Sequence, residues 1–433
     1  MELVFVDPEP PDAAGGGIRT HIRLSMEICR GSGIPARVYT HNPSAFPEGT
    51  AFPIGRRPWL RSPFRGLAYR FLYAENTLWE HAYWLERELA MTDVPGRVIE
   101  FADFLGYGFF ALRNPGLRAR CQVRVHTPGF LVPAVRKGLH ARLAAALSAW
   151  RERDCLGRVP VLAAPSAEFI REKLPWLRGW EHIPNPLPAA LPGPGAALQA
   201  RTEQARAYEA ALASPGTPPA SGDPAWSAAA PDPSSLHDAA RAASGPDRLI
   251  PARFLYLGRI EERKGVLVLA RAFARLAAER PLASLTLVGS EGDPAYGAAL
   301  RALIESQPRG IRARMTWEAP CPPEGRAALF ARFTALVVPS LWENSPYVYF
   351  EGMAAGLPCI GSATGEMRAV AAATGAPSPA AGDEGAWSAA LRRHCDGADA
   401  ELPGRQLAYL AAQERTAKDK LLAAWRKSAG EAA

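Results

Sequence analysis

Two glutamates eight positions apart carry the strongest chemical signal in this 433-residue sequence. Glu343 and Glu351 lie in LWENSPYVYFEGMAAGLPCI (341–360), directly after an apolar run typical of a strand. Carboxylates accept hydrogen bonds from vicinal hydroxyls, so the pair could hold sugars on both flanks of a bound diphosphate. The alternative interpretation is a capped helix whose two glutamates simply face solvent.

The residues between the two glutamates predict a helix start that binds an anion. Ser345 is of the type preferred at the N-cap, and Pro346 of the type preferred at the first helical position. The free amides of Tyr347 and Val348 would then lie at the positive end of the helix dipole. A phosphate group is stabilised at such a position.

A second signal is the cationic turn YLGRIEERKG (256–265). Arg259 and Lys264 follow an apolar strand and flank a turn. At the carboxyl end of a parallel strand, two cations could neutralise a diphosphate and stabilise it as a leaving group. Glu261 and Glu262 leave a second interpretation open, in which the carboxylates pair with the cations in a solvated run of charges.

Two weaker signals lie in the first half of the chain. The turn Gly15–Gly17 lets backbone approach a phosphate or an acceptor closely, although it lacks the G-x-G-x-x-G spacing of a dinucleotide fingerprint. His126, in RVHTPG, closes a predicted strand and could hydrogen-bond a substrate hydroxyl. Ordinary turn geometry and a structural histidine are the alternatives.

Alternating strands and helices must position these residues, and such alternation is typical of parallel β–α–β units. In the first half we expect strands at 3–6, 36–40, 97–101, 121–126 and 161–166, with helices at 20–30 and from Ala167. In the second half we expect strands at 253–259, 284–290, 313–319, 334–340 and 358–362, with helices at 266–278, 296–305, 324–330 and after Ser345. The predicted fold class is α/β, with two doubly wound Rossmann-like domains facing across a cleft.

A change in composition separates the two halves. Thirteen of the 41 prolines lie between Pro184 and Pro251, mixed with alanine, glycine and serine, which breaks both helical and strand periodicity. The expected domains are 1–189, an insert or linker at 190–250, and 251–405. A terminal helix, 406–433, is expected to pack back on the first domain.

Charge and cysteine content exclude several classes of protein. The net charge of +7 is modest for this length, so we expect no nucleic-acid partner. The cysteines are scattered without metal-ligand spacing, and we expect no bound metal; they are Cys29, Cys121, Cys155, Cys321, Cys359 and Cys395. Apolar runs are shorter than the roughly 18–20 residues of a membrane span, and no secretory leader is recognisable. We therefore expect a cytoplasmic protein.

One segment could bring the protein to a membrane surface. RRPWLRSPFRGLAYRF, from Arg56 to Phe71, interleaves arginines with aromatic residues, as an anionic bilayer would favour. It predicts peripheral contact with the inner face of a membrane. A basic loop in solvent is the alternative.

The order of the motifs resembles the retaining glycosyltransferases of family 4, which have the two-domain glycosyltransferase B (GT-B) fold. The matching segments are GGGIRTHI, VHTP, APSAEFIREKL, HIPNPL, LGRIEERKG, LVGS and PSLWENSPYVYFEGMAAGLPCIGS. They cover most of the chain outside the 190–250 insert. The E-x7-E element combined with G-R-x4-K-G is the specific part of the resemblance.

The resemblance implies a role for each candidate residue. Arg259 and Lys264 would hold the diphosphate of a UDP- or GDP-linked donor, together with the helix start at Ser345, Tyr347 and Val348. Glu351 would bind the ribose hydroxyls. The donor sugar would contact Glu343, Asn344 and His126, while Gly16 and Gly17 would line the cleft between donor and acceptor.

The same resemblance implies transfer with retention, without a metal or other cofactor, to an unidentified acceptor. The residues implied in catalysis are Glu343, Lys264, Arg259 and His126. The sequence departs from the family at Gly352, usually alanine, at Arg19, often glutamate, and in the turn ATGEMRAV. The alternatives are a catalytically silent relative that binds a nucleotide sugar or docks on a membrane, and an epimerase or phosphorylase of the same fold.

Overall fold

The computed structural model describes residues 1–9, 16–54, 73–132, 138–188 and 252–431. The chain divides into two units, one formed by Met1–Leu187 with Glu414–Ala433 and the other by Pro188–Gln413. The proline-rich insert at 190–250, the basic segment Arg56–Phe71 and Gly15 lie outside the described residues.

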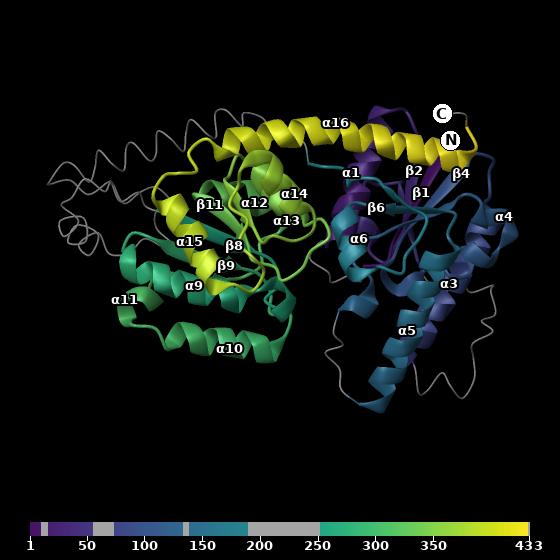
Figure 1. Ribbon diagram of the computed structural model, residues 1–433. Coiled ribbons are helices and arrows are strands. Elements are labelled where there is room, and N and C mark those ends of the chain that lie inside the picture. The colour runs from purple at the N-terminus through teal and green to yellow at the C-terminus, as the bar shows by residue number, and fades with distance from the viewer. Residues whose placement is uncertain (10–15, 55–72, 133–137, 189–251, 432–433) are drawn as a thin grey trace. The chain divides into compact units, whose positions relative to one another are not determined.

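The first unit is built on a seven-stranded parallel sheet in the order β3-β2-β1-β4-β5-β6-β7 (Figure 1). Its central strands β1 and β4 are buried except at Glu2 and are largely apolar, as expected of a parallel sheet covered by helices. The strands are β1 Glu2–Asp7, β2 Ala36–Thr40, β3 Ala51–Pro53, β4 Arg97–Ala102, β5 Cys121–Arg124, β6 Val161–Ala164 and β7 Trp180–His182. The helices are α1 Gly17–Gly31, α3 Tyr73–Met91, α4 Pro115–Arg118, α5 Leu139–Arg158 and α6 Ala167–Lys173.

Strand order reverses between β1 and β4, which lie side by side although about 90 residues of chain separate them. In a doubly wound sheet the carboxyl ends at such a switch point are where ligands bind. Gly16 precedes α1 after β1, η2 Phe104–Gly106 follows β4, and His126 and η4 Gly129–Leu131 follow β5, the next strand of the sheet.

The second unit holds a five-stranded parallel sheet in the order β10-β9-β8-β11-β12. Its core is formed by alternating strand residues with the apolar faces of three helices, α9, α10 and α15. The strands are β8 Arg253–Leu257, β9 Ser284–Val288, β10 Met315–Glu318, β11 Ala335–Val338 and β12 Cys359–Gly361. The helices are α9 Val266–Glu279, α10 Pro294–Glu305, α11 Arg309–Arg312, α12 Arg326–Ala331, α13 Tyr347–Ala354, α14 Gly365–Thr374, α15 Glu384–Cys395 and α16 Leu402–Ala429.

Helix α16 begins four residues before the expected position and contributes to both units. Gln406 exchanges two hydrogen bonds with the backbone of Cys359, at 2.9 and 2.8 Å, so its first turns belong to the second unit. Trp425 and Leu421 enter the core of the first unit, where Trp425 packs edge-on against Phe5 at 6.0 Å.

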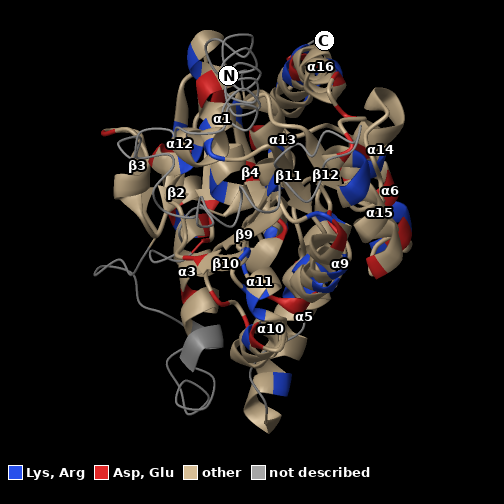
Figure 2. Cartoon of the chain, turned by 90° about the vertical axis from the view of Figure 1, so that its left-hand side faces the viewer, with Lys and Arg blue, Asp and Glu red and all other residues tan. Residues whose placement is uncertain are grey.

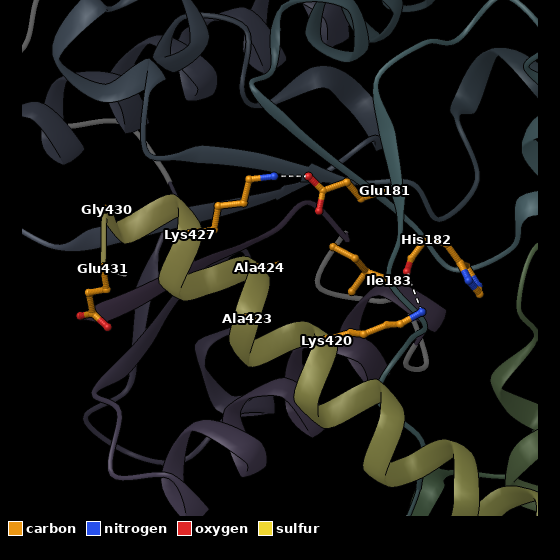
Figure 3. A pocket seen from close by; sticks show the side chains of 9 residues that line it. All are labelled: Glu181, His182, Ile183, Lys420, Ala423, Ala424, Lys427, Gly430 and Glu431. Carbon is orange, nitrogen blue, oxygen red and sulfur yellow. Dashed lines mark hydrogen bonds and ion pairs between the residues drawn. The ribbon is translucent and has the colours of Figure 1, made fainter. Parts of the chain in front are cut away.

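The last turns of α16 are further held by polar contacts along β7 (Figure 3). The Lys427 ammonium lies 2.5 Å from the Glu181 carboxylate, and Lys420 donates to the His182 carbonyl at 3.4 Å. An open groove of about 650 Å³ lies beside these contacts. Lys427 faces a carboxylate and Lys420 a backbone carbonyl, so the groove has no strong preference for an anion.

The sequence predicted most strands and helices that carry the motifs, and the differences are local. α1 begins at Gly17 rather than Thr20, and β5 ends at Arg124, so His126 lies two residues beyond the strand it was expected to close. The helix expected at 324–330 is a 3-10 turn, η6 Pro323–Gly325, followed by α12. α3, α5, α15 and the edge strands β3 and β7 were not anticipated.

The described helices carry mixed charge, with basic and acidic residues interspersed (Figure 2). None of the helices in the described ranges combines the length and apolar character that crossing a membrane requires. All six cysteines are free thiols, and five of them are buried.

Candidate active site

Glu343 lies in the loop after β11 and is 6% exposed. Two donors hydrogen-bond to its Oε1 atom, Lys264 Nζ at 2.5 Å and Ser340 Oγ at 2.8 Å, and the Arg263 guanidinium forms an ion pair with the same atom at 3.2 Å. Burial alone raises the pKa of this carboxyl, but Lys264 and Arg263 lower it to about 2. Glu343 is therefore ionised at neutral pH.

Lys264 reaches Glu343 because the next residue, Gly265, adopts a backbone geometry that favours glycine. Lys264 is the last residue of the 3-10 turn η5 Glu262–Lys264, and Gly265 follows with φ of 65°. A Cβ atom on Gly265 would lie 2.1 Å from the Pro339 carbonyl oxygen, so the glycine allows the loop after β11 to pack against the start of α9. Burial lowers the pKa of the Lys264 ammonium, and Glu343 opposes that effect.

Arg259 lies in the same turn but is 57% exposed. Its guanidinium is 3.3 Å from Glu261, which also pairs with Arg263 at 3.0 Å. A chain of ion pairs therefore runs from Arg259 to Glu343 through these two residues. The alternative pairing with acidic neighbours is found for Arg259, whereas Lys264 pairs with Glu343 instead.

Glu351 lies in α13, where burial raises the pKa of its carboxyl and Arg326 opposes the rise. Nη1 of Arg326 is 2.5 and 2.6 Å from the two carboxylate oxygens. The structure thus gives each glutamate of the E-x7-E element its own cation, Lys264 for Glu343 and Arg326 for Glu351.

The predicted cap of α13 is wrong. The helix begins at Tyr347 with Pro346 as its N-cap, and no side chain caps it. The Ser345 hydroxyl instead lies by the Glu366 carboxyl, and its effect on that group opposes burial, which raises the pKa of Glu366 to about 7. Tyr347 and Val348 still lie in the first turn of α13, where the backbone amides point out of the helix end.

Asn344 and Ser345 are fixed against the start of α14. The Glu366 amide donates to the Asn344 carbonyl at 3.0 Å. Gly365 has φ of 53°, and a Cβ there would lie 2.1 Å from the Glu343 carbonyl oxygen. This close approach explains why the turn needs glycine at that position although the flanking residues depart from the family.

His126 lies in the first unit, beyond β5. Its ring centroid is 5.0 Å from that of His21, with the planes at 66°. Burial, His21 and Arg124 lower the pKa of His126 well below its ordinary value, so the ring is neutral at pH 7.

Gly16 and Gly17 form the start of α1, with Gly16 as the N-cap. Glu9 occupies the space beside Gly16: its carboxylate accepts from the Gly16 amide at 3.0 Å, and a Cβ on Gly16 would lie 2.0 Å from it. Arg19, the departure from the family, pairs with Asp7 at 3.0 Å and Glu9 at 3.7 Å.

Three residues of the site, Arg263, Arg326 and Glu366, were not predicted from the sequence. Arg263 is inside the cationic turn, where a count of charges could have included it. Arg326 stands 25 residues before its partner and carries no local signal. In the described ranges no three His, Cys, Asp or Glu side chains are grouped as a metal site would require.

Comparison with known proteins shows what the second unit and the fold are similar to. Residues 251–396, which include Arg259, Lys264, Glu343 and Glu351, match the family described as glycosyl transferases group 1. A D-inositol 3-phosphate glycosyltransferase from Rhodococcus opacus (strain B4) is 36% identical over 134 residues. That match spans 30% of this chain and 29% of the relative, so less than a third of the relative's length is compared.

Solved structures match nearly the whole chain at low identity. An α,α-trehalose-phosphate synthase (UDP-forming) from Burkholderia xenovorans, in complex with glucose-6-phosphate, has a TM-score of 0.62 at 16% identity, covering 99% of this chain and 98% of that one. WaaG, a glycosyltransferase involved in lipopolysaccharide biosynthesis, has a TM-score of 0.57 at 15% identity over 97% and 98%. Anabaena Alr3699/HepE, in complex with UDP and glucose, has a TM-score of 0.56 at 13% identity over 98% of each chain.

The fold is therefore that of the GT-B glycosyltransferases, two parallel-sheet α/β domains. Its second unit contains a group 1 glycosyltransferase domain.

Proposed function

We propose that the protein is a retaining glycosyltransferase that moves a sugar from a UDP- or GDP-linked donor to an unidentified acceptor. The observation that carries this proposal is the cluster of Lys264, Arg263 and Ser340 on the buried Glu343, inside the domain that matches the group 1 family. UDP in the HepE complex supports a uridine donor.

The leaving diphosphate would be held by Lys264, Arg259 and the start of α13. Lys264 now contacts Glu343, so a bound diphosphate would compete with that carboxylate for the ammonium. Arg263 and Ser340 also hold Glu343, and its position does not depend on Lys264 alone. The largely buried Lys264, the more exposed Arg259 and a helix start would together stabilise developing negative charge, and the proposed mechanism uses no metal.

The remaining roles are those that the resemblance implies. Glu351, oriented by Arg326, would accept the ribose hydroxyls. Glu343 and Asn344 would bind the donor sugar, and the neutral His126 ring would lie beside the sugar that is transferred. Gly16 and Gly17 would line the acceptor side.

The proposed reaction needs no enzyme nucleophile. The bond between C1 of the donor sugar and the diphosphate breaks while the acceptor oxygen bonds to C1 on the same face. The acceptor's hydroxyl proton passes to an oxygen of the departing diphosphate. The product therefore keeps the donor's anomeric configuration.

The first experiment is a thermal-shift screen against UDP- and GDP-sugars, because a donor that binds only the folded state raises the melting temperature. The donor that binds is then incubated with candidate acceptors, and the anomer of the product is read by NMR. Release of nucleotide that depends on acceptor supports transfer over epimerisation. Neither binding nor slow hydrolysis of any donor would support a catalytically silent relative, and added EDTA tests metal independence.

Location in the cytoplasm is part of the proposal. The six free thiols fit a reducing compartment, where disulfides rarely persist.

Peripheral contact with an anionic membrane is a second candidate property. Besides Arg56–Phe71, helix α5 favours it, since Leu139, Leu143 and Trp150 are exposed at 71%, 48% and 51%. They recur at helical spacing, and residues 138–151 contain arginine and histidine but no acidic residue. Flotation with liposomes of neutral and anionic lipid, comparing wild type with Leu143→Glu, tests this contact.

A further inference from the structure

A buried chain of polar contacts leads from His126 to the C-terminal helix. The His21 ring, on α1, lies edge-on to His126 at 5.0 Å. His21 Nε2 is 2.6 Å from Glu100 Oε1, on β4, and the other oxygen of Glu100 accepts from Trp425 Nε1 at 3.1 Å. His21, Glu100 and Trp425 are 1%, 3% and 0% exposed.

Burial and neighbouring charges together set the charge states of this chain of contacts. Burial alone raises the pKa of Glu100, but Arg124 and His21 lower it to about 2, and burial lowers the pKa of His21 to about 4. A neutral His21 therefore donates from Nε2 to an ionised Glu100 at neutral pH. Its tautomer and ring orientation are fixed by that contact.

A chain of this kind is an expensive way to fill a core. Burying charged groups costs more than packing apolar side chains of similar size, so it contributes little to stability by itself. What it does provide is orientation, because each ring is held by a directional hydrogen bond. The ring held at the end of the chain faces His126.

We propose that Trp425 is a positioning residue for His126, acting through Glu100 and His21, so that the C-terminal helix helps to set the geometry of the active site. This inference rests on the proposed role of His126 beside the transferred sugar. The groups that face His126 are His21 from α1, Glu100 and Asp103 from β4 and the turn after it, and Arg124 from β5.

The test variant is Trp425→Phe in the full chain, which keeps a ring in the core and removes only the N–H donor. We expect kcat to fall about tenfold and the donor KM to stay within about twofold, because the His126 ring is then misplaced but still present. Trp84→Phe is the matched control. Trp84 is a buried tryptophan of the same unit, and its N–H has no hydrogen-bond partner among the described residues.

A double-mutant cycle separates positioning from packing. If Trp425 acts through His126, Trp425→Phe costs activity in the wild type but little in a His126→Asn background. Equal losses in both backgrounds would overturn the proposal. An inactive wild type would instead refute the proposed function.

A second measurement does not depend on activity. The imidazole ¹⁵N and ring ¹H signals of His126, assigned with His126→Asn, should move in Trp425→Phe and stay in place in Trp84→Phe. If Trp425→Phe does not fold, Glu100→Gln is the second variant, since its single amide oxygen cannot accept from both His21 and Trp425 and so breaks the chain of contacts at its middle. Unmoved His126 signals in a folded variant would contradict the inference.

Discussion

Lys264 and Glu343 form a 2.5 Å ion pair between residues 79 positions apart, at the carboxyl ends of the neighbouring strands β8 and β11. In the exposed pair Lys427–Glu181 the nitrogen and oxygen atoms are also 2.5 Å apart, and the side chains are 61% and 42% exposed. The two pairs share their chemistry and differ in burial. They therefore offer a direct comparison of a buried and a solvated ion pair in one chain.

Replacing Lys264 by alanine should lower kcat by more than about 100-fold, since it removes a charge from the proposed leaving-group site. It should also destabilise the second unit, because Glu343 loses its nearest cation. Steady-state kinetics and thermal unfolding measure the two effects. Lys427→Ala is the control and should change both by little. Unchanged transfer and donor hydrolysis in Lys264→Ala would remove Lys264 from the mechanism.

Glu343 predicts loss of stability in acid. Its folded pKa of about 2 lies below the ordinary value of 4.5, so its contribution is complete above about pH 5 and disappears as pH falls towards 2. The shift corresponds to roughly 3 kcal/mol, and Glu100 adds a contribution of the same sign. Urea unfolding at pH 7, 5 and 3 should show a smaller acid-induced loss in Glu343→Gln than in the wild type. Parallel curves for the two proteins would contradict the assignment.

The raised pKa of Glu366 predicts the opposite dependence of stability on pH. Its folded pKa of about 7 is above the ordinary value of 4.5, so the folded state binds the extra proton and stability falls as pH rises from about 4.5 to 7. Glu366→Gln should therefore gain stability over the wild type at pH 8, by roughly 3 kcal/mol, and little at pH 4. Glu152, also raised to about 7, contributes the same trend in both proteins and cancels in the comparison. An equal effect at both pH values would show that charge is not the cause.

Arg326 should affect nucleotide affinity rather than turnover. With Arg326→Gln, the buried Glu351 loses its cation and its pKa rises, which weakens its ability to accept ribose hydroxyls. We expect Kd for the nucleoside diphosphate to rise about tenfold, equivalent to roughly 1.4 kcal/mol. Arg332→Gln is the matched control, since Arg332 pairs with Glu318 at the surface at 2.9 Å. Equal affinity for the nucleoside diphosphate in both variants would show that Arg326 has no role in nucleotide binding.

The sequence predicted the doubly wound sheets because alternating apolar strands and helices are local patterns. Lys264 and Glu343 could be named from their motifs, yet their pairing could not, since it depends on how two loops pack. Arg326 is the clearest case: it reaches Glu351 from a separate helix, and no spacing rule connects them. The cap at Ser345 failed for a related reason, because a distant carboxyl, Glu366, lies beside the hydroxyl that local rules assign to the helix.

Gly265 makes the packing of these loops testable. Gly265→Ala combines a left-handed φ of 65° with a Cβ 2.1 Å from the Pro339 carbonyl oxygen. We expect a loss of about 3 kcal/mol or more in the free energy of unfolding, together with lower activity as Lys264 moves away from Glu343.

Two glycines separate the causes of that loss. Gly33 has the same φ of 65°, and no atom lies within 4 Å of the point that a Cβ would occupy there, so Gly33→Ala should cost about 1 kcal/mol from backbone strain alone. Gly310, inside α11 with open space around it, should gain about 0.5–1 kcal/mol as alanine. If Gly265→Ala cost no more than Gly33→Ala, the close contact with Pro339 would not be what holds Lys264 against Glu343.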